Sequence, residues 1–297
     1  MAEPLNSHPE ALIKAATLTE ALPWMRRFGG KVFVIKLGGN AMVDDELIQS
    51  FADDMVFLAT VGVKPIVVHG GGPQISQALA DRGIATEFRG GYRVTSTAAI
   101  PVVREVLRET ISQNVADRIN RHSDLAVVLS GEDDNLFVAT KRGVVIEGVS
   151  IDLGHVGEVT GVNPSVVMDV VEAGKIPVVS SLAPTEDGSG LLNVNADAAA
   201  AALAVAVGAE KLILMTDVPG LYRDWPNTDS LISSLSAQEL EALLPSLESG
   251  MIPKMSACLD AVRGGVPKAA IIDGRLGHSV LLEAFTTEGI GTEVVGP

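Results

Sequence analysis

Residues 66–75 read IVVHGGGPQI, in which an apolar run is followed by three glycines, a proline and a helix-like segment. This order is typical of a β-strand whose turn opens an α-helix, and the backbone N–H groups of such a turn commonly bind an anion. Ile75 stands where the last glycine of a G-x-G-x-x-G dinucleotide motif would be, and the chain contains no G-x-x-x-x-G-K-[ST] loop. The three glycines therefore predict an anion site of another kind.

Short β-branched runs alternate with longer helical patterns along the whole chain. Strands are predicted at 31–37, 65–69, 125–130, 136–141, 144–147, 156–160, 176–180, 211–216 and 269–272, and helices at 44–61, 74–82, 98–119, 164–173, 197–207, 237–244, 254–263 and 279–286. Strands separated by helices favour parallel pairing with helices on both faces. We expect a three-layer α/β/α sandwich with an open, mainly parallel sheet, whose ligands lie outside the carboxyl ends of the strands. The turn GEDDN at 131–135 is expected to join its two flanking strands as an antiparallel hairpin.

The composition is that of a folded globular protein with an acidic surface. Of the 297 residues, 47% are hydrophobic and 20% are charged, and the net charge is −15 with a pI near 4.7. Such a surface repels nucleic acid and anionic membranes, so neither is expected as a partner, and an anionic substrate needs a local cluster of cations. The single cysteine, Cys258, permits no intrachain disulfide and lies in a helix-like run, which predicts a buried thiol in a cytoplasmic protein.

The first 27 residues differ from the rest because apolar side chains, including Leu12, Leu18, Leu22 and Trp24, recur at helical spacing ahead of the first strand. Such a segment is either a helix packed on its own domain or an arm that docks on a second subunit. We expect a helical arm over 1–27, followed by the main domain over 28–297.

Two glycine turns are expected side by side at the carboxyl ends of the first two strands. Lys36 lies inside an apolar strand, where a lysine is costly unless it is paired or functional, or unless the strand is an edge strand and the lysine faces water. Gly38 and Gly39 follow it, and glycines let backbone N–H groups approach a ligand closely. Gly70–Gly72 form the second turn, and the preceding His69 is interpreted as a hydrogen-bonded strand-end residue.

Four further residues complete the candidate set. Arg93 lies in a glycine- and threonine-rich loop and suits a bidentate grip on a carboxylate, unless it is a solvated surface residue. In LLNVNADAAA, Asn193 and Asp197 lie at the start of a predicted helix, where Asn195 or Asp197 is expected to act as the N-cap. Lys254 stands at the start of another helix, a placement that favours a bound anion because cations are disfavoured there.

This inventory suits phosphoryl transfer between two anions, because such catalysis is mostly positioning plus stabilisation of charge on the moving group. The sequence shows no Ser-His-Asp set, and its five histidines lack zinc-ligand spacing. A carboxylate acceptor is already ionised at pH 7, so no general base is required.

Six blocks of the sequence resemble, in order, the motifs of the amino-acid kinase family. They are VIKLGGNAM, VVHGGGPQI, GYRVTS, LLNVNADAAA, LILMTDVPGLY and GMIPKM. The match runs from about residue 31 to the C-terminus, and six ordered blocks are far more specific than one glycine loop. Within the family the blocks are most similar to those of members that act on N-acetyl-L-glutamate.

The resemblance implies ATP-dependent phosphorylation of the side-chain carboxylate of N-acetyl-L-glutamate, the second step of arginine synthesis. It implies an acyl-substrate lobe at about 28–207 and a nucleotide lobe at about 208–297. The resemblance implies that Lys36 and Lys254 stabilise the transferring phosphoryl group and that Asp197 orients both lysines. The residues implied for the acyl substrate are Gly71, Gly72, Arg93 and Asn193. The residues implied for the nucleotide, together with the two lysines, are Gly38, Gly39, Thr216 and Asp217. Mg²⁺ is expected to arrive with ATP, without a metal site of protein side chains.

Both ends of the chain resemble the arginine-inhibited branch of the family. This implies L-arginine as an inhibitor, a homohexamer built through the N-terminal helices, and an inhibitor site formed by Lys211, His278, Glu288 and Gly291. The loop RDWPNTDSL at 223–231 departs from the shorter family version, so nucleotide contacts are not assigned there.

Three other readings remain open on sequence grounds. Other kinases of the fold act on glutamate, aspartate, carbamate or UMP. A nonenzymatic amino-acid sensor would lack the catalytic lysines, which are present here. An NAD-dependent dehydrogenase is disfavoured because Ile75 breaks the fingerprint.

Overall fold

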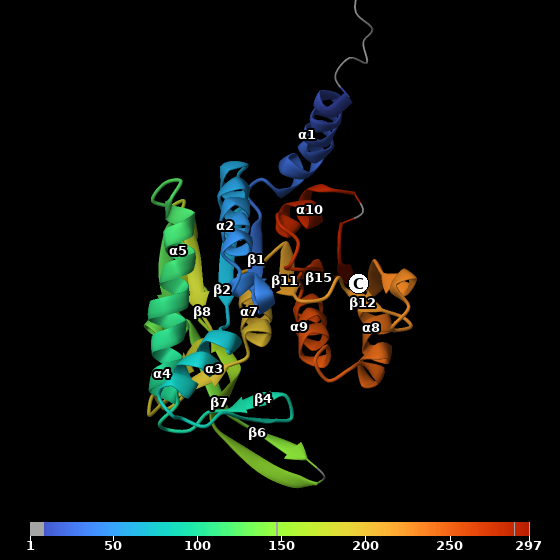
Figure 1. The fold of residues 1–297 in the computed structure, drawn as a ribbon. Coiled ribbons are helices and arrows are strands. Elements are labelled where there is room, and N and C mark those ends of the chain that lie inside the picture. The colour runs from blue at the N-terminus through green and yellow to red at the C-terminus, as the bar shows by residue number, and fades with distance from the viewer. Residues whose placement is uncertain (1–8, 147, 288, 297) are drawn as a thin grey trace, which may run out of the picture.

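The computed structural model describes residues 9–146, 148–287 and 289–296, and its centre is an eight-stranded sheet between two layers of helices (Figure 1). The strand order is β14-β16-β15-β11-β1-β2-β8-β5, and the pairs from β15 to β5 are all parallel. Only the β15–β16 pair is antiparallel within this sheet. The predicted α/β/α sandwich with an open, mainly parallel sheet is confirmed.

The strands of this sheet are β1 (Val32–Leu37), β2 (Lys64–His69), β5 (Ala126–Ser130), β8 (Ile176–Ser180), β11 (Lys211–Thr216), β14 (Ser234–Ser236), β15 (Lys268–Asp273) and β16 (Thr292–Val295). The helices are α1 (Pro9–Phe28), α2 (Asp45–Thr60), α3 (Gly72–Asp81), α4 (Ile100–Arg104), a π-helical stretch (Glu105–Ile111), α5 (Ser112–Asn120), α6 (Ser165–Glu172), α7 (Ala196–Ala206), α8 (Ala237–Leu243), α9 (Ile252–Arg263) and α10 (Ser279–Phe285).

The alternation of side chains along β1 shows how the two helical layers are filled. Phe33 and Ile35 are fully buried in the core beneath α2 and α5, whereas Val34 is fully buried in the core beneath α7 and α9. Successive residues of a strand point to opposite faces, so both faces of this central strand are covered. Lys36 points to the same face as Val34, at the carboxyl end of the strand.

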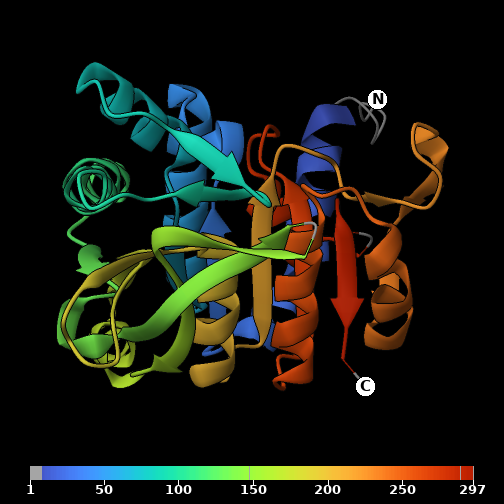
Figure 2. The same cartoon turned by 90° about the horizontal axis from the view of Figure 1, so that it is seen from below.

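Two smaller sheets lie at the carboxyl end of the main one. A four-stranded sheet has the order β6-β7-β10-β9, and β3 pairs with β4 as a hairpin. Their bounds are β3 (Glu87–Arg89), β4 (Tyr92–Val94), β6 (Phe137–Ile146), β7 (Val149–Val162), β9 (Leu182–Pro184) and β10 (Leu191–Val194), and a last pair joins β12 (Leu221–Tyr222) to β13 (Leu231–Ile232). Figures 1 and 2 show the β3–β4 and β6–β7 hairpins at the same end of the molecule as α3.

The predicted GEDDN hairpin is wrong. β5 pairs with β8 in the main sheet, whereas β6 pairs with β7 in the smaller one. The Asp133 carboxylate accepts a hydrogen bond from the Ser130 N–H, and Asp134 and Asn135 adopt left-handed backbone angles. This turn carries the chain out of one sheet and into another. An antiparallel insertion does exist, but β6 and β7 form it.

The described part of the N-terminal arm is the helix α1 (Pro9–Phe28), which packs on its own domain mainly through its last turns, whereas residues 1–8 of the predicted arm lie outside the described residues. Trp24 stacks on Phe28 with ring centroids 5.9 Å apart, and Phe28 meets Phe285 of α10 at 6.5 Å. Leu18 is 66% exposed and Leu22 is 51% exposed, so the earlier turns leave apolar side chains in solvent. Figure 1 shows α1 projecting from the body. Among the described helices, none combines the length and apolar character needed to cross a bilayer.

Candidate functional site

Lys36 is the next-to-last residue of β1, which lies between β11 and β2 inside the sheet, so the edge-strand interpretation is wrong. Its side chain is almost completely buried, and Nζ lies 2.9 Å from Oδ1 of Asp197. A buried ammonium group is costly unless an anion lies beside it, and Asp197 supplies that anion.

Asp197 lies in the first turn of α7, and Asn195 is the residue that caps this helix. The Asn195 side chain accepts hydrogen bonds from the N–H groups of Asp197 and Ala198. The Asp197 carboxylate is thus free to face the lysines, and Lys254 of α9 donates to its Oδ2 at 3.4 Å. Burial alone would raise the pKa of Asp197, but the charges of Lys36 and Lys254 hold it below the ordinary value.

The first glycine turn lies directly over this cluster. A Cβ at Gly38 would overlap Nζ of Lys36, and a Cβ at Gly39 would overlap the carboxylate of Asp217. Gly39 has φ +67°, a left-handed conformation that favours glycine. Thr216, the last residue of β11, is buried beside this turn. The structure therefore places Gly38 against Lys36 and Gly39 against Asp217, all four of which are among the residues predicted for the nucleotide site.

The second glycine turn forms one wall of a cavity of about 200 Å³, which is lined by Gly71, Gly72, Arg93 and Asn193 among others. Arg93 is buried and donates to Gly72 O at 2.8 Å and to Ser76 Oγ at 2.7 Å. Its guanidinium lies 4.7 Å from the centroid of the Phe88 ring, and burial lowers its pKa. The solvated-surface interpretation of Arg93 is wrong. All four residues predicted for the acyl substrate meet in this one cavity.

His69 is a fully buried strand-end residue with a partner at each ring nitrogen, as interpreted from the sequence. Nδ1 lies 3.0 Å from Gly70 O, and Nε2 lies 2.6 Å from Ser112 Oγ. Burial lowers its pKa to about 4, so the ring is neutral at pH 7. Cys258 is fully buried as predicted, and burial raises the pKa of its thiol well above the usual range.

A cavity of about 470 Å³ includes Val218, the residue that follows Asp217, and part of the loop 223–231, whose nucleotide contacts the sequence left unassigned. Tyr222, Trp225, Leu247 and Met251 contribute to its lining. The Tyr222 and Trp225 rings lie 5.2 Å apart, and Trp225 belongs to the loop that departs from the family version. An aromatic and apolar lining of this kind suits a planar base.

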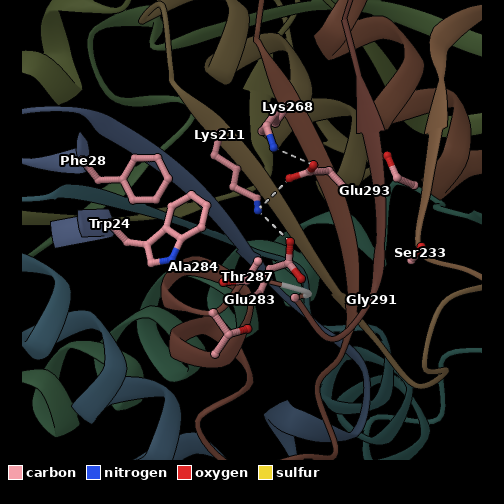
Figure 3. Close-up of a pocket in the computed structure, with 13 residues that line it drawn as sticks. Trp24, Phe28, Lys211, Ser233, Lys268, Glu283, Ala284, Thr287, Gly291 and Glu293 are labelled. Atoms are coloured by element: carbon pink, nitrogen blue, oxygen red, sulfur yellow. Dashed lines mark hydrogen bonds and ion pairs between the residues drawn. The ribbon is translucent and has the colours of Figure 1, made fainter. Parts of the chain in front are cut away.

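A cavity of about 480 Å³ lies at the opposite end of β11 from Thr216, and its lining includes Lys211 and Gly291 (Figure 3). Lys211 Nζ lies 2.6 Å from Glu283 and 3.1 Å from Glu293, and Lys268 Nζ lies 2.7 Å from Glu293. Burial would raise the pKa of Glu293, but Lys211 and Lys268 hold it below the ordinary value. The cavity thus offers paired charges of both signs, together with the aromatic side chains of α1.

His278 and Glu288 are the other two residues predicted for this inhibitor site. His278 is not brought into the cavity: its Nδ1 lies 2.7 Å from Oδ1 of Asp54 in α2. It occupies the N-cap position of α10, the helix that carries Glu283. Glu288 lies outside the described residues.

Sequence reasoning missed several residues of this cavity, namely Trp24, Phe28, Lys268, Glu283 and Glu293. Glu283 offered a signal, because it stands among apolar residues in the last predicted helix and is buried there. The other residues offered no such signal in the sequence, because they come together in this cavity only through the packing of α1 and β16. Within the described part of the chain, no three His, Cys, Asp or Glu side chains gather into a metal-binding group.

Known proteins are similar to this chain in sequence and in fold. The model of the amino acid kinase family matches residues 31–273. The acetylglutamate kinase of Clavibacter michiganensis subsp. michiganensis (strain NCPPB 382) is 61% identical over 287 residues, which cover 96% of this chain and 95% of the relative.

Solved structures of an N-acetylglutamate synthase from Neisseria gonorrhoeae are also similar. The complex with coenzyme A and N-acetyl-glutamate has a TM-score of 0.83 and 26% identity, over 95% of this chain and 63% of the synthase. The complex with coenzyme A and L-arginine has a TM-score of 0.78 and 26% identity, over 95% of this chain and 65% of the synthase. This chain spans less than two thirds of that synthase.

Proposed function

This chain belongs to the amino acid kinase family. We propose that it transfers the γ-phosphoryl group of ATP to the side-chain carboxylate of N-acetyl-L-glutamate. The family resemblance of the six sequence blocks is confirmed. The product is N-acetyl-L-glutamyl 5-phosphate, the second intermediate of arginine synthesis. The observation that carries the proposal is the cluster in which the buried Asp197 pairs with the buried Lys36 and the partly exposed Lys254, between two glycine turns.

The cluster suits a reaction in which negative charge moves between two oxygens. A carboxylate oxygen of the acceptor forms a bond to the γ-phosphorus while the bond from that phosphorus to the leaving oxygen of ADP breaks. Lys36 and Lys254 supply positive charge to the transferring group, and Asp197 holds both ammonium groups in place. No side chain has to remove a proton, because the acceptor is ionised at pH 7.

The cavity at the second glycine turn is the proposed acyl-substrate site. Gly71 and Gly72 offer backbone N–H groups to the reacting carboxylate. Arg93 binds the α-carboxylate of the substrate, and Asn193 faces its amide. The volume of about 200 Å³ suits a small amino-acid derivative and is too small for a nucleotide.

ATP is the co-substrate of the family, and its phosphates are proposed to face Gly38, Gly39, Thr216 and Asp217. The nucleoside end would enter the aromatic cavity beside Tyr222. Mg²⁺ would arrive on the phosphates as part of the co-substrate. With this assignment the acyl-binding residues come from about 28–207 and much of the nucleotide site from about 208–297, which is the proposed division into two lobes.

L-Arginine is the proposed inhibitor, bound in the cavity beside Lys211. An amino acid with a guanidinium, an ammonium and a carboxylate needs partners of both signs, and the cavity supplies Glu283, Glu293, Lys211 and Lys268. The similar synthase complexed with L-arginine supports this choice of ligand. His278 would act on the site only through α10.

Self-association through α1 is also proposed, with a hexamer as the expected assembly. The apolar side chains of Leu12, Ile13, Leu18 and Leu22 are each more than half exposed on a helix that projects from the body. A second copy of this helix would cover them. Light scattering on the full chain and on a Leu18→Glu/Leu22→Glu variant tests this: the variant should have a smaller mass, and an equal mass would contradict it.

The function is tested by an ATP-dependent acyl-phosphate assay with hydroxylamine trapping. N-Acetyl-L-glutamate, L-glutamate and L-aspartate are compared, each with and without L-arginine. Hydroxamate from the acetylated substrate alone, suppressed by arginine, is the expected result. Product without arginine sensitivity would remove the inhibitor site from the proposal. No product from the acetylated substrate, in folded protein that binds ATP, would overturn the proposed substrate.

A further inference from the structure

We propose that His69 is a positioning residue, whose ring fixes the peptide unit between Gly70 and Gly71 so that the Gly71 N–H faces the acyl-substrate cavity. His69 is the last residue of β2, is fully buried, and is absent from the lining of that cavity. Its effect must therefore pass through the backbone that follows it. The inference rests on the proposed function, because it gives this N–H a substrate carboxylate to bind.

The hydrogen bonds around the ring permit only one arrangement of protons. Gly70 O can only accept, so the ring nitrogen 3.0 Å from it, Nδ1, must carry a proton. The buried ring is neutral at pH 7, so Nε2 carries none and must accept. Ser112 Oγ, 2.6 Å from Nε2, is the donor. His69 is therefore held as the Nδ1–H tautomer.

The Ser112 hydroxyl also lies within donating distance of Leu107 O, at 3.0 Å, but it has only one proton to give. Because Nε2 of His69 carries no proton, the 2.6 Å contact between the two side chains is a hydrogen bond only if the hydroxyl donates that proton to the ring. The Leu107 carbonyl keeps a hydrogen bond without it, since it also accepts from the backbone N–H of Ser112 at the end of the π-helical stretch Glu105–Ile111. Single-turn π-helical segments are frequent at functional sites, and this one places Ser112 behind the second glycine turn.

The hydrogen bond from His69 to Gly70 O also sets the direction of the Gly71 N–H, because both groups belong to one peptide unit. The C=O of Gly70 and the N–H of Gly71 belong to one planar trans unit and point in opposite directions. Because His69 Nδ1–H holds the carbonyl on the side of the ring, the Gly71 N–H is turned away from it. Gly71 lines the cavity, and no acceptor within the described part of the chain pairs with its N–H.

The same helix also packs against Gly71 itself. A Cβ at Gly71 would overlap Cδ1 of Ile111 and Cδ2 of Leu107, and both residues belong to the π-helical stretch. Leu107 and Ser112 therefore back the turn together, one by packing and the other through His69. A glycine without this backing could rotate its peptide units freely, and the N–H would lose its fixed direction.

The experiment compares His69→Leu with His69→Asn in the full-length protein. Leucine removes the donor to Gly70 O, whereas the asparagine amide can occupy the Nδ1 position and donate. We expect His69→Leu to raise the KM for N-acetyl-L-glutamate roughly 10- to 100-fold, the range for a hydrogen bond to a charged group, with the KM for ATP within about twofold of the wild type. We expect His69→Asn to restore most of that loss.

Ser180→Ala is the matched control for loss of a buried polar strand end. Ser180 pairs with His69 in the sheet, is fully buried, donates to Ser130 Oγ at 3.1 Å, and does not line the cavity. It should lower Tm without changing the KM for the acyl substrate. An equal rise of both KM values in His69→Leu, an unchanged acyl KM, or His69→Asn as impaired as His69→Leu would overturn the positioning role.

A second measurement is independent of activity and of the stability of the variants. The ring ¹⁵N resonances of His69 in the wild type, identified by their loss in His69→Asn, should show the neutral Nδ1–H tautomer from pH 8 down to about pH 5. An Nε2–H tautomer, or titration near pH 6.5, would overturn the inference. Failure of the proposed function appears separately, as a wild type with this tautomer that does not phosphorylate N-acetyl-L-glutamate.

Discussion

Nζ of Lys36 lies 2.9 Å from Oδ1 of Asp197, although Lys36 lies near the end of a central strand and Asp197 lies in the first turn of a helix on one face of the sheet. Both side chains are almost fully buried. A buried ion pair is weak evidence for stability, since desolvation offsets much of the attraction. Its position between two glycine turns supports the proposed role in phosphoryl transfer.

Asp197→Asn should lower kcat by about 10²–10³, because the neutral amide no longer fixes two ammonium groups at the phosphoryl path. Hydroxamate formation at saturating substrates measures the change, and circular dichroism checks the fold. Asp117→Asn on α5, an exposed carboxylate that takes no part in the cluster, is the matched control. A kcat within threefold of the wild type in a folded Asp197→Asn protein would remove Asp197 from the catalytic cluster.

Lys36→Ala and Lys254→Ala should each lower kcat by about 10²–10³, the usual cost of one group that stabilises charge in the transition state. The stability effects should differ. The Lys36 side chain is 9% exposed and that of Lys254 is 25% exposed, so loss of Lys36 leaves the buried Asp197 carboxylate with only its weaker partner. Urea unfolding should show Lys36→Ala as the less stable variant, and near-normal turnover in either would refute its assigned role.

Much of the fold and of this cluster was predictable because the signals are local. A lysine at the end of an apolar run, followed by glycines, has few structural explanations, and β1 shows why: both of its faces are buried, so Lys36 cannot reach open solvent. The N-cap at Asn195 follows equally from local chemistry.

What the sequence did not reveal depends on contacts between distant segments. GEDDN has hairpin composition, yet the choice of strand partner is made by packing, and β8 competes successfully for β5. The meeting of Trp24 with Glu283 in one cavity requires that α1 pack on α10. No local pattern encodes that arrangement.

Arg93→Ala should raise the KM for N-acetyl-L-glutamate by roughly 10- to 100-fold, with a smaller effect on kcat, because it removes a charge-assisted contact to the α-carboxylate. Arg93→Lys should restore only part of the loss, since an ammonium group cannot donate to Gly72 O and Ser76 Oγ and still offer a planar fork. Initial rates over a range of substrate concentrations measure both constants. An unchanged KM in Arg93→Ala would place the substrate elsewhere.

Glu283→Gln should weaken L-arginine binding at least about tenfold, as expected when one charged partner of a buried cation is neutralised. The Glu283 carboxylate is buried beside Lys211, so its charge acts with little screening. Calorimetric titration with L-arginine measures the affinity directly. Glu241→Gln, an exposed carboxylate on α8, serves as the control. Equal affinity in Glu283→Gln and the wild type would place the inhibitor outside this cavity.

The pair formed by Asp54 and His278 should make stability depend on pH. Burial raises the pKa of Asp54 to about 6, although the His278 ring and the N–H groups of Val280 and Leu281 oppose the shift. In the unfolded chain the same carboxyl titrates at about 3.9. Between these values the folded protein binds the extra proton, so this group's contribution to stability is complete at low pH and is lost as the pH rises through about 6.

The lost contribution is about 3 kcal/mol, from a difference of about two pKa units. Urea unfolding of the wild type and of Asp54→Asn from pH 4 to pH 7.5 gives the free energy of unfolding of each protein, and the change with pH in the difference between the two measures this contribution. The comparison with Asp54→Asn is needed because other groups, such as Asp197 and Glu293, carry lowered pKa values in both proteins. The wild type should lose stability relative to Asp54→Asn as the pH rises. Parallel curves would mean that Asp54 titrates in the folded protein as it does in the unfolded chain.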